Sequence, residues 1–99
     1  MSYSVIFHLV AEKEFQEAFL WYEQRLDGLG ERFTKAAESS LNQISSTPLL
    51  YARKHASFRE VKIESFPYVI VYKVYEKKKT VFIVAIYHTS RNPRKKYRR

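Results

Sequence analysis

Two neighbouring segments, PYVIVYKVY (residues 67–75) and TVFIVAIYH (residues 80–88), carry the strongest secondary-structure signal in this 99-residue chain. Both are rich in β-branched and aromatic residues, which favour strands. Their nearly continuous apolar character is typical of well-covered, central strands. Pro67 stands at the start of the first segment, where it removes no hydrogen bond from the interior of a sheet. Residues 76–79, Glu-Lys-Lys-Lys, fit the turn between the two strands, so the sequence predicts a β-hairpin here.

The residues before this hairpin continue the strand pattern. Residues 58–65 alternate with a period of two, which predicts a third strand with Arg59, Val61 and Ile63 on one side and Lys62 on the other. Residues 49–57 have no such period, and we expect a connector. At the other end of the chain, residues 3–9 alternate again and predict a short N-terminal strand.

Between these strands the apolar period changes to that of a helix. Apolar residues recur at helical spacing from Ala11 to Leu26 and again from Leu29 to Ile44, and Asp27-Gly28 marks the turn between them. The order of elements is strand, helical hairpin, then three strands, which predicts an α+β fold with both helices on one face of an antiparallel sheet. The inward positions of these periods predict the core: Val5, Phe7, Phe15, Ala18, Tyr22, Phe33, Leu41, Ile44, Val61, Ile63, Ile70, Tyr72, Ile83 and Ala85.

Charge is distributed unevenly along the chain. Its 18 Lys and Arg against 10 Asp and Glu give a net charge of +8, yet six of the basic residues lie in 91–99 and leave 12 for the rest. We therefore expect one domain over 1–90 and a basic C-terminal tail over 91–99. Basic clusters of this kind meet phosphates or an acidic protein, although they also serve as solvated surface. The candidate contacts to nucleic acid or another target are Lys62, Arg91, Arg94, Lys95, Lys96, Arg98 and Arg99.

The composition excludes several classes of site. The chain has no Cys and only two Gly, so it contains no disulfide framework, thiolate nucleophile, phosphate-binding loop or dinucleotide fingerprint. Its three His lack the spacing of a helical metal pair, and we expect no metal and no cofactor. The N-terminal residues do not resemble a signal peptide, and no apolar run is long enough to cross a membrane, so a cytoplasmic location is expected.

The strand half resembles the C-terminal pattern of the RelE/ParE superfamily, the toxins of type II toxin–antitoxin modules once called plasmid-stabilisation proteins. The pattern consists of Arg59-x-Val61, Phe66-Pro67-Tyr68-x-Ile70-x-Tyr72, Val81-x-Ile83-x-Ala85-x-x-His88 and Arg91-x-Pro93. The helical half is similar at Ala11, Phe15, Ala18, Tyr22-Glu23, Leu29-Gly30, Phe33, Leu41, Ile44 and Pro48. The resemblance implies a helical hairpin packed on a curved antiparallel sheet, in agreement with the periodicities.

The superfamily contains two activities. RelE-like members cut mRNA in the ribosomal A site with basic side chains and a C-terminal Tyr or His, whereas ParE-like members lack that set and are thought to poison DNA gyrase. Here Lys62 retains one of the two strand lysines of RelE. The RelE arginines fall on Val69 and Thr89. We therefore expect a ParE-like toxin that inhibits growth by binding a target such as gyrase, and the sequence leaves enzyme activity open.

The alternative is a RelE-like, metal-independent endoribonuclease that acts on mRNA in the ribosome. The catalytic Tyr of RelE falls near Lys95, and Tyr97 replaces it if the chain slips by two residues. This chemistry needs a base, a cation and an acid within a few ångströms of one another. The candidates for these roles are Lys62, His88, Arg91 and Tyr97. Arg59 shares a side with Val61 and is expected to be structural.

Both activities imply a cognate antitoxin, which in this family is usually acidic in its toxin-binding segment and partly disordered. The first helix has more apolar residues than one face can bury, and an apolar helix needs a second cover. Phe19 and Leu20 are the candidate antitoxin contacts. The alternative is that Trp21 packs on the connector over 49–57 and no apolar surface is left over.

Overall fold

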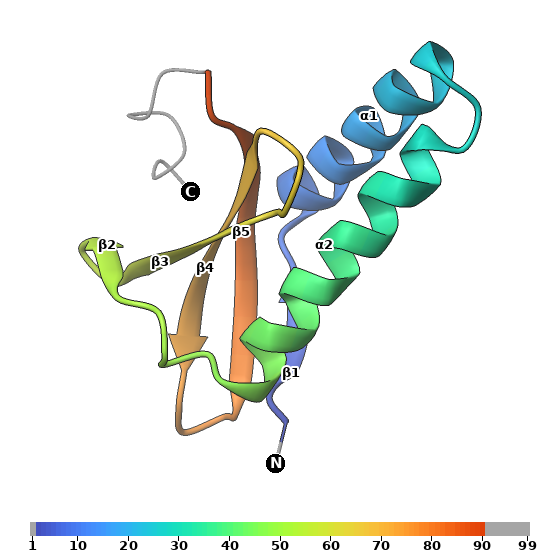
Figure 1. The fold of residues 1–99 in the computed structure, drawn as a ribbon. Helices are drawn as coiled ribbons and strands as arrows, with labels where there is room; N and C mark the ends of the chain where they lie inside the picture. The colour runs from blue at the N-terminus through green and yellow to red at the C-terminus, as the bar shows by residue number, and fades with distance from the viewer. Residues whose placement is uncertain (1, 91–99) are drawn as a thin grey trace.

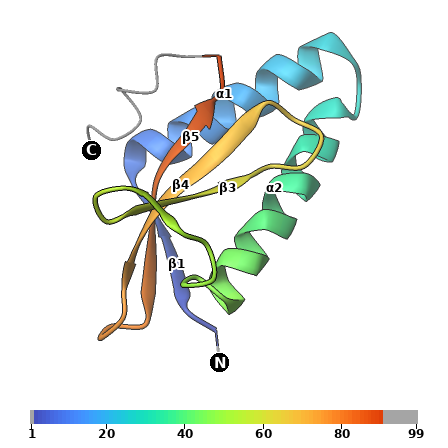
Figure 2. The ribbon, with the colours of Figure 1, turned by 60° about the vertical axis from the view of Figure 1, so that its left-hand side comes forward.

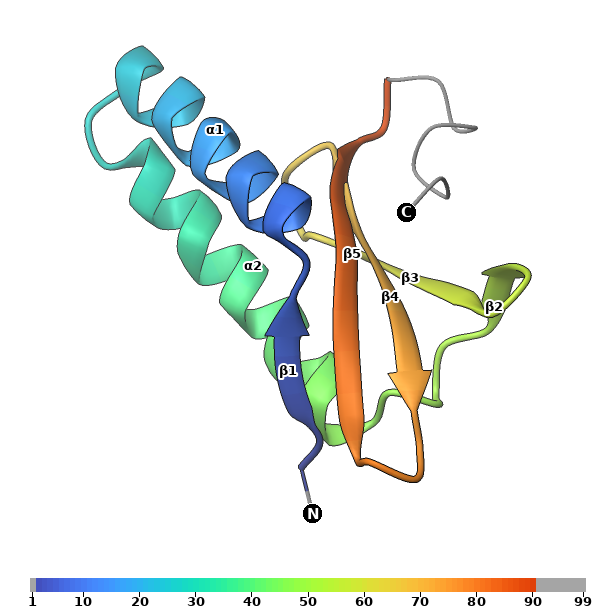
Figure 3. The ribbon, with the colours of Figure 1, turned by 180° about the vertical axis from the view of Figure 1, so that it is seen from behind.

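The computed structural model describes residues 2–90, in which two helices cover one face of a five-stranded sheet. The elements follow the order β1 (Ser4–Phe7), α1 (Leu9–Arg25), α2 (Leu29–Ser46), β2 (Arg53–His55), β3 (Phe58–Lys62), β4 (Tyr68–Tyr75) and β5 (Thr80–His88). Figures 1 and 3 show α1 and α2 side by side on one side of the sheet, while β2 and β3 curl away from them. The predicted fold class is confirmed.

Two details of the sheet differ from the prediction. The strand order is β1-β5-β4-β3-β2, and β1 runs parallel to β5, so the sheet is mixed. A helical hairpin separates β1 from the other strands, and such a long connection allows a parallel pairing. The expected connector over 49–57 also contains the short strand β2, which pairs with β3 through an irregular register. All three β2 residues are exposed, so they lack the apolar alternation that would reveal a strand.

The main core lies between the helices and the sheet. It contains most of the predicted residues, including Phe33, Ile44, Ile70, Tyr72 and Ile83, each at 0% exposure. Val5, Phe7, Phe15 and Leu41 are only half-buried and pack against the edge of this cluster. Core burial of this kind supplies most of the stability of a domain of this size.

Ala85 is buried, but on the opposite face of the sheet from the prediction. Tyr72 pairs with Ile83 and Val71 pairs with Ala85, so Val84 is an extra residue in β5. Such a β-bulge shifts the alternation of inward and outward residues by one. Ile86 therefore faces the helices, while Ala85 joins a second cluster with Phe58, Val71, Val84 and Tyr87.

The two helices are joined by a tight turn that Glu23 holds. Its two carboxylate oxygens accept hydrogen bonds from the backbone N–H groups of Gly28 (2.9 Å) and Gly30 (3.0 Å). Gly28 has a φ of 87°, a left-handed conformation that favours glycine. A Cβ atom on Gly30 would lie 2.7 Å from the carbonyl oxygen of Phe19, so glycine here permits the helices to approach each other closely.

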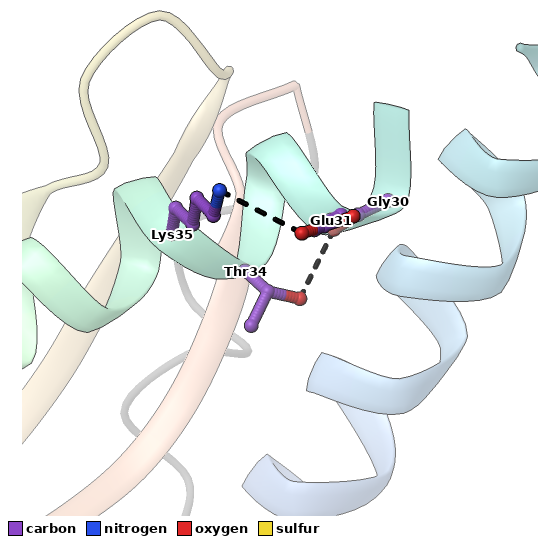
Figure 4. Close-up of polar contacts among 4 residues, drawn as sticks. All are labelled: Gly30, Glu31, Thr34 and Lys35. Atoms are coloured by element: carbon purple, nitrogen blue, oxygen red, sulfur yellow. Dashed lines mark hydrogen bonds and ion pairs between the residues drawn. The ribbon is translucent and has the colours of Figure 1, made fainter. Parts of the chain in front are cut away.

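Figure 4 shows two side-chain contacts in the first turns of α2. The Thr34 hydroxyl donates to the Gly30 carbonyl at 3.0 Å, and the Lys35 ammonium lies 3.6 Å from a carboxylate oxygen of Glu31. Both partners of this ion pair are about 70% exposed, so it adds little to stability. Within residues 2–90, neither helix is long and apolar enough to cross a membrane.

The segment after α2 is fixed to the sheet by two hydrogen bonds. The buried Tyr72 hydroxyl donates to the Pro48 carbonyl at 2.8 Å, and burial raises the pKa of Tyr72 to about 12. The Arg59 guanidinium donates to the Tyr51 carbonyl. Arg59 therefore contacts a backbone group, as predicted for a structural residue, although that group belongs to the connector.

Candidate functional site

A cleft of about 630 Å³ opens between α1 and the adjoining ends of β4 and β5. Figure 2 shows α1 passing behind β5 in that view. One face of α1 contributes residues 14, 17, 18, 21 and 22, whose spacing places them on one side of a helix. The full lining is Glu14, Glu17, Ala18, Trp21, Tyr22, Pro67, Tyr68, Ile86, His88 and Ser90.

Aromatic rings form one wall of this cleft. Tyr22 lies edge-on to Trp21 with centroids 5.1 Å apart, and it is 6.2 Å from Tyr68. Burial, with a smaller contribution from Tyr68, raises the pKa of Tyr22, so its phenol is neutral at physiological pH. Trp21 is 51% exposed and presents its indole to solvent and to the cleft.

His88 lies at the end of β5 and is held by its neighbours. Its Nδ1 accepts a hydrogen bond from the Ser90 backbone N–H at 3.1 Å and lies 2.7 Å from the Ser90 hydroxyl. The ring also packs edge-on against Tyr68, with centroids 5.0 Å apart. Because Nδ1 accepts from a backbone N–H, a neutral His88 carries its proton on Nε2.

Glu14 connects the helix to the sheet at the bottom of the cleft. The pairing of β1 with β5 ends at Ile83, so β5 continues beyond its parallel neighbour. The Glu14 carboxylate accepts the backbone N–H of Ile86 at 3.1 Å, a group on this uncovered part of the strand edge. The side chain of Glu14 thus stands where the backbone of another strand would pair.

The structure separates two of the sequence-predicted catalytic candidates. Lys62 pairs with Val69, which belongs to the cluster on the open face of the sheet, the face away from the helices. His88 pairs with Tyr68, and it lines the cleft on the helical side. Arg59 pairs with Tyr72 in the main core, so Arg59 and Lys62 do point to opposite sides. Arg91, Tyr97 and the remaining predicted tail contacts, Arg94, Lys95, Lys96, Arg98 and Arg99, lie outside the described residues.

The face of the sheet that carries Lys62 holds a second apolar cluster, which is buried. Its second cluster is formed by Phe58, Val71, Val84, Ala85 and Tyr87, with Val69 and Phe82 packed against it. Lys73 stands above the Phe58 ring, 4.7 Å from its centroid. Two lysines, Lys62 and Lys73, thus lie on this face of the sheet.

The predicted antitoxin contacts on α1 lie outside this cleft. Phe19 is half-buried and Leu20 is 55% exposed. Together with Phe15 and Gln16 they line a shallow, largely apolar groove of about 280 Å³. The apolar surface predicted for this helix is thus present, while the partner that covers it stays a prediction.

Trp21, which the sequence analysis considered only as a packing residue against the connector over 49–57, lines the cleft. Adjacent residues on a helix point about 100° apart, so Trp21 and Tyr22 cannot both face the core. Tyr22 is 8% exposed and takes the inward position, whereas Trp21 turns towards the cleft and Arg25. The Arg25 guanidinium lies 4.2 Å from the centroid of the indole. Tyr22 follows the predicted core residue Ala18 by four positions, and this helical spacing could have indicated Tyr22 as the inward residue.

Residues 5–93 match the sequence profile of a family described as "ParE toxin of type II toxin-antitoxin system, parDE". Among solved structures, the chain is similar to a free arginine double mutant of the E. coli toxin RelE (TM-score 0.69, 22% identity, covering 91% of this chain and 86% of that one). It is also similar to the chromosomal ParDE toxin–antitoxin system of P. aeruginosa, with a TM-score of 0.64 and 18% identity, covering 90% of this chain and 98% of that one. The RelBE2 complex of Mycobacterium tuberculosis is similar with a TM-score of 0.60 and 18% identity, covering 89% of this chain and 99% of that one. No match is found among curated proteins.

The family match spans most of the chain, and the neighbouring structures share its fold. The chain therefore belongs to the ParE toxin family of type II toxin–antitoxin systems, within the RelE/ParE superfamily.

Proposed function

We propose that this toxin acts in the ParE-like manner, by binding a cytoplasmic target such as DNA gyrase rather than by cutting RNA. The observation that carries the proposal is the placement of Lys62 and His88 on opposite faces of the sheet. Two groups so placed do not act on one scissile bond, because acid–base catalysis needs both within hydrogen-bond reach of the reacting atoms. Val69, at a position where RelE carries a cation, agrees with this view.

A cognate antitoxin would neutralise the toxin by covering α1. Leu20 and Trp21 are both more than half exposed, and the groove beside Phe19 offers an apolar surface for an amphipathic segment. The solved neighbours include toxin–antitoxin complexes from two other organisms. In this proposal residues 1–90 form the toxin domain, and the basic tail over 91–99 strengthens attraction to the target.

The target can be tested with the full chain and three variants. Induced expression should slow growth, and co-expression of the protein encoded next to it should restore growth. The purified chain should inhibit supercoiling by gyrase, while mapping of RNA ends in induced cells should reveal no new cuts in translated mRNA. Lys62→Ala should keep the toxicity, since Lys62 has no catalytic role in this proposal.

The opposite pattern would support the nuclease. New cuts in ribosome-bound mRNA that disappear with both Lys62→Ala and Tyr97→Phe, together with unaffected gyrase, would show the proposal to be wrong. Arg53→Ala serves as the control for loss of a basic side chain, because Arg53 is an exposed residue of β2 and lies outside the cleft.

A further inference from the structure

We propose that the cleft between α1 and the ends of β4 and β5 is a binding site for an arginine side chain presented by a protein partner. The chain carries 18 basic residues against 10 acidic ones, yet the charged side chains that line this cleft are Glu14 and Glu17. No Lys or Arg is among the described residues of its lining. The cleft is thus an acidic, aromatic pocket in a basic protein. This proposal goes beyond the toxin activity and does not depend on it.

The aromatic wall suits a flat cation. A guanidinium above an aromatic face is attracted by the quadrupole of the ring, most strongly for Trp. Trp21 already stacks with the Arg25 guanidinium, 4.2 Å from its centroid, so an incoming arginine must displace Arg25 or use the opposite face of the indole. Tyr68 adds a second ring to the cleft wall, whereas Tyr22 is 8% exposed and packs against both Trp21 and Tyr68.

The carboxylates supply the counter-charge. Glu17 is exposed and precedes Trp21 by one helical turn, so both side chains reach the same part of the cleft. A carboxylate can accept two parallel N–H bonds from a guanidinium, which adds geometric selectivity to the attraction. An arginine that enters between Glu17 and the rings would therefore gain an ion pair and a stacking contact together.

The position of Glu14 favours a side chain over a strand as the ligand. A partner strand that extended the sheet here would need the backbone N–H of Ile86, which the Glu14 carboxylate already accepts at 3.1 Å. Glu14 therefore prevents another strand from pairing with β5 at Ile86, while the cleft itself has a volume of about 630 Å³. Arginine is expected to bind better than lysine, because its guanidinium is planar and more weakly hydrated than an ammonium.

Trp21 allows a direct test because it is the only tryptophan of the chain. The full-length protein is titrated with the blocked peptide acetyl-Gly-Arg-Gly-amide while Trp21 fluorescence is recorded. We expect a saturable change, at least threefold weaker binding of the lysine peptide, and no binding of the citrulline peptide, which has the shape of arginine without its charge. Glu17→Gln should weaken arginine binding about threefold to tenfold. Glu12→Gln, an equal charge change outside the cleft, should leave it unchanged.

Four results would overturn the proposal. One is the absence of a saturable change with the arginine peptide, and another is equal binding of the citrulline peptide. The third is an equal effect of Glu17→Gln and Glu12→Gln. If only the double variant Arg91→Gln, Arg94→Gln bound the arginine peptide, the site would serve the chain's own tail and the assignment to a partner would be wrong. Thermal unfolding of each variant verifies that it is folded.

Discussion

The two helices of the hairpin are similar in length but differ in what they leave exposed. α2 buries Phe33, Ala37 and Ile44 along one stripe, and none of its large apolar side chains is exposed within Leu29–Ser46. α1 buries Ala11, Ala18 and Tyr22, yet it leaves an outer row exposed: Leu9 (81%), Val10 (40%), Leu20 (55%) and Trp21 (51%). Folding therefore buries the large apolar side chains of α2, whereas several of those of α1 stay exposed.

This difference indicates that α2 contributes to stability, and that the exposed residues of α1 contribute to recognition. A helix with a single apolar stripe needs only the core of its own domain, whereas apolar residues around the whole circumference need a second cover. Both the apolar groove at Phe19 and the aromatic cleft at Trp21 are formed by α1. We therefore expect substitutions in α2 to change folding, and substitutions on the outer side of α1 to change binding.

The largest effect is expected from Phe33→Ala in α2. The Phe33 ring is fully buried and contacts the rings of Phe15, Tyr22, Phe66 and Tyr68. Its removal should lower the free energy of unfolding by ~3–5 kcal/mol, from lost burial and from the cavity left behind. Urea unfolding followed by circular dichroism measures this, with Leu20→Ala as a control that should change stability by less than ~0.5 kcal/mol. Equal losses for both variants would remove the distinction between the helices.

A smaller loss is expected where the two helices touch. Gly30→Ala places a Cβ atom 2.7 Å from the Phe19 carbonyl oxygen, a backbone atom that cannot move without shifting α1. Alanine normally stabilises a helix by up to ~1 kcal/mol relative to glycine, but overpacking here should give a net loss of ~1–3 kcal/mol. Ser39→Ala on the exposed side of α2 is the matched control, and it should be neutral or slightly stabilising. If Gly30→Ala raised the unfolding midpoint, the close packing described for Gly30 would be wrong.

Much of this arrangement could be predicted from the sequence, because apolar periodicity records which side of an element is buried. The helices, the N-terminal strand and the hairpin of residues 67–88 follow directly from that pattern. Pattern alone did not predict the bulge at Val84, since an extra residue within a uniformly apolar strand leaves no mark on hydrophobicity. Ala85 and Ile86 consequently lie on the faces of the sheet opposite to those that a regular alternation predicts. Nor did it predict β2, whose exposed Arg-Lys-His sequence is held by pairing with β3.

The site was less predictable than the fold. His88 and Leu20 could be singled out by position and excess hydrophobicity, but the cleft joins residues up to 76 positions apart, from Glu14 to Ser90. Their proximity depends on how α1 crosses β5, which a single sequence does not encode in any local pattern. Lys62 and His88 are grouped by resemblance as candidates for RelE-like chemistry, and that resemblance does not give the direction of either side chain. The pleat of the sheet then separates their side chains.

A substitution in the turn between the two helices should have an intermediate effect on the free energy of unfolding. Glu23→Ala removes the acceptor of two backbone N–H groups, those of Gly28 and Gly30 at the start of α2. A carboxylate near a helix N-terminus also interacts favourably with the helix dipole. We expect a loss of ~1–2 kcal/mol in the free energy of unfolding. The neighbouring exposed Gln24→Ala is the control; a loss as large in that variant would mean that the capping bonds do not stabilise the hairpin.

The smallest effect on stability, and the largest on binding, is expected on the outer side of α1. The double variant Leu9→Ser, Leu20→Ser removes two exposed apolar side chains, so the free energy of unfolding should change by less than ~1 kcal/mol. If the antitoxin covers this helix, its affinity should fall at least tenfold, equivalent to ~1.4 kcal/mol or more. Isothermal titration calorimetry with the protein encoded next to the toxin measures this affinity. Lys35→Ser, an equally accessible position on the outer side of α2, should retain it. Unchanged affinity in the double variant would mean that the exposed row of α1 is not where the antitoxin binds, and a loss confined to Lys35→Ser would place the partner on α2 instead.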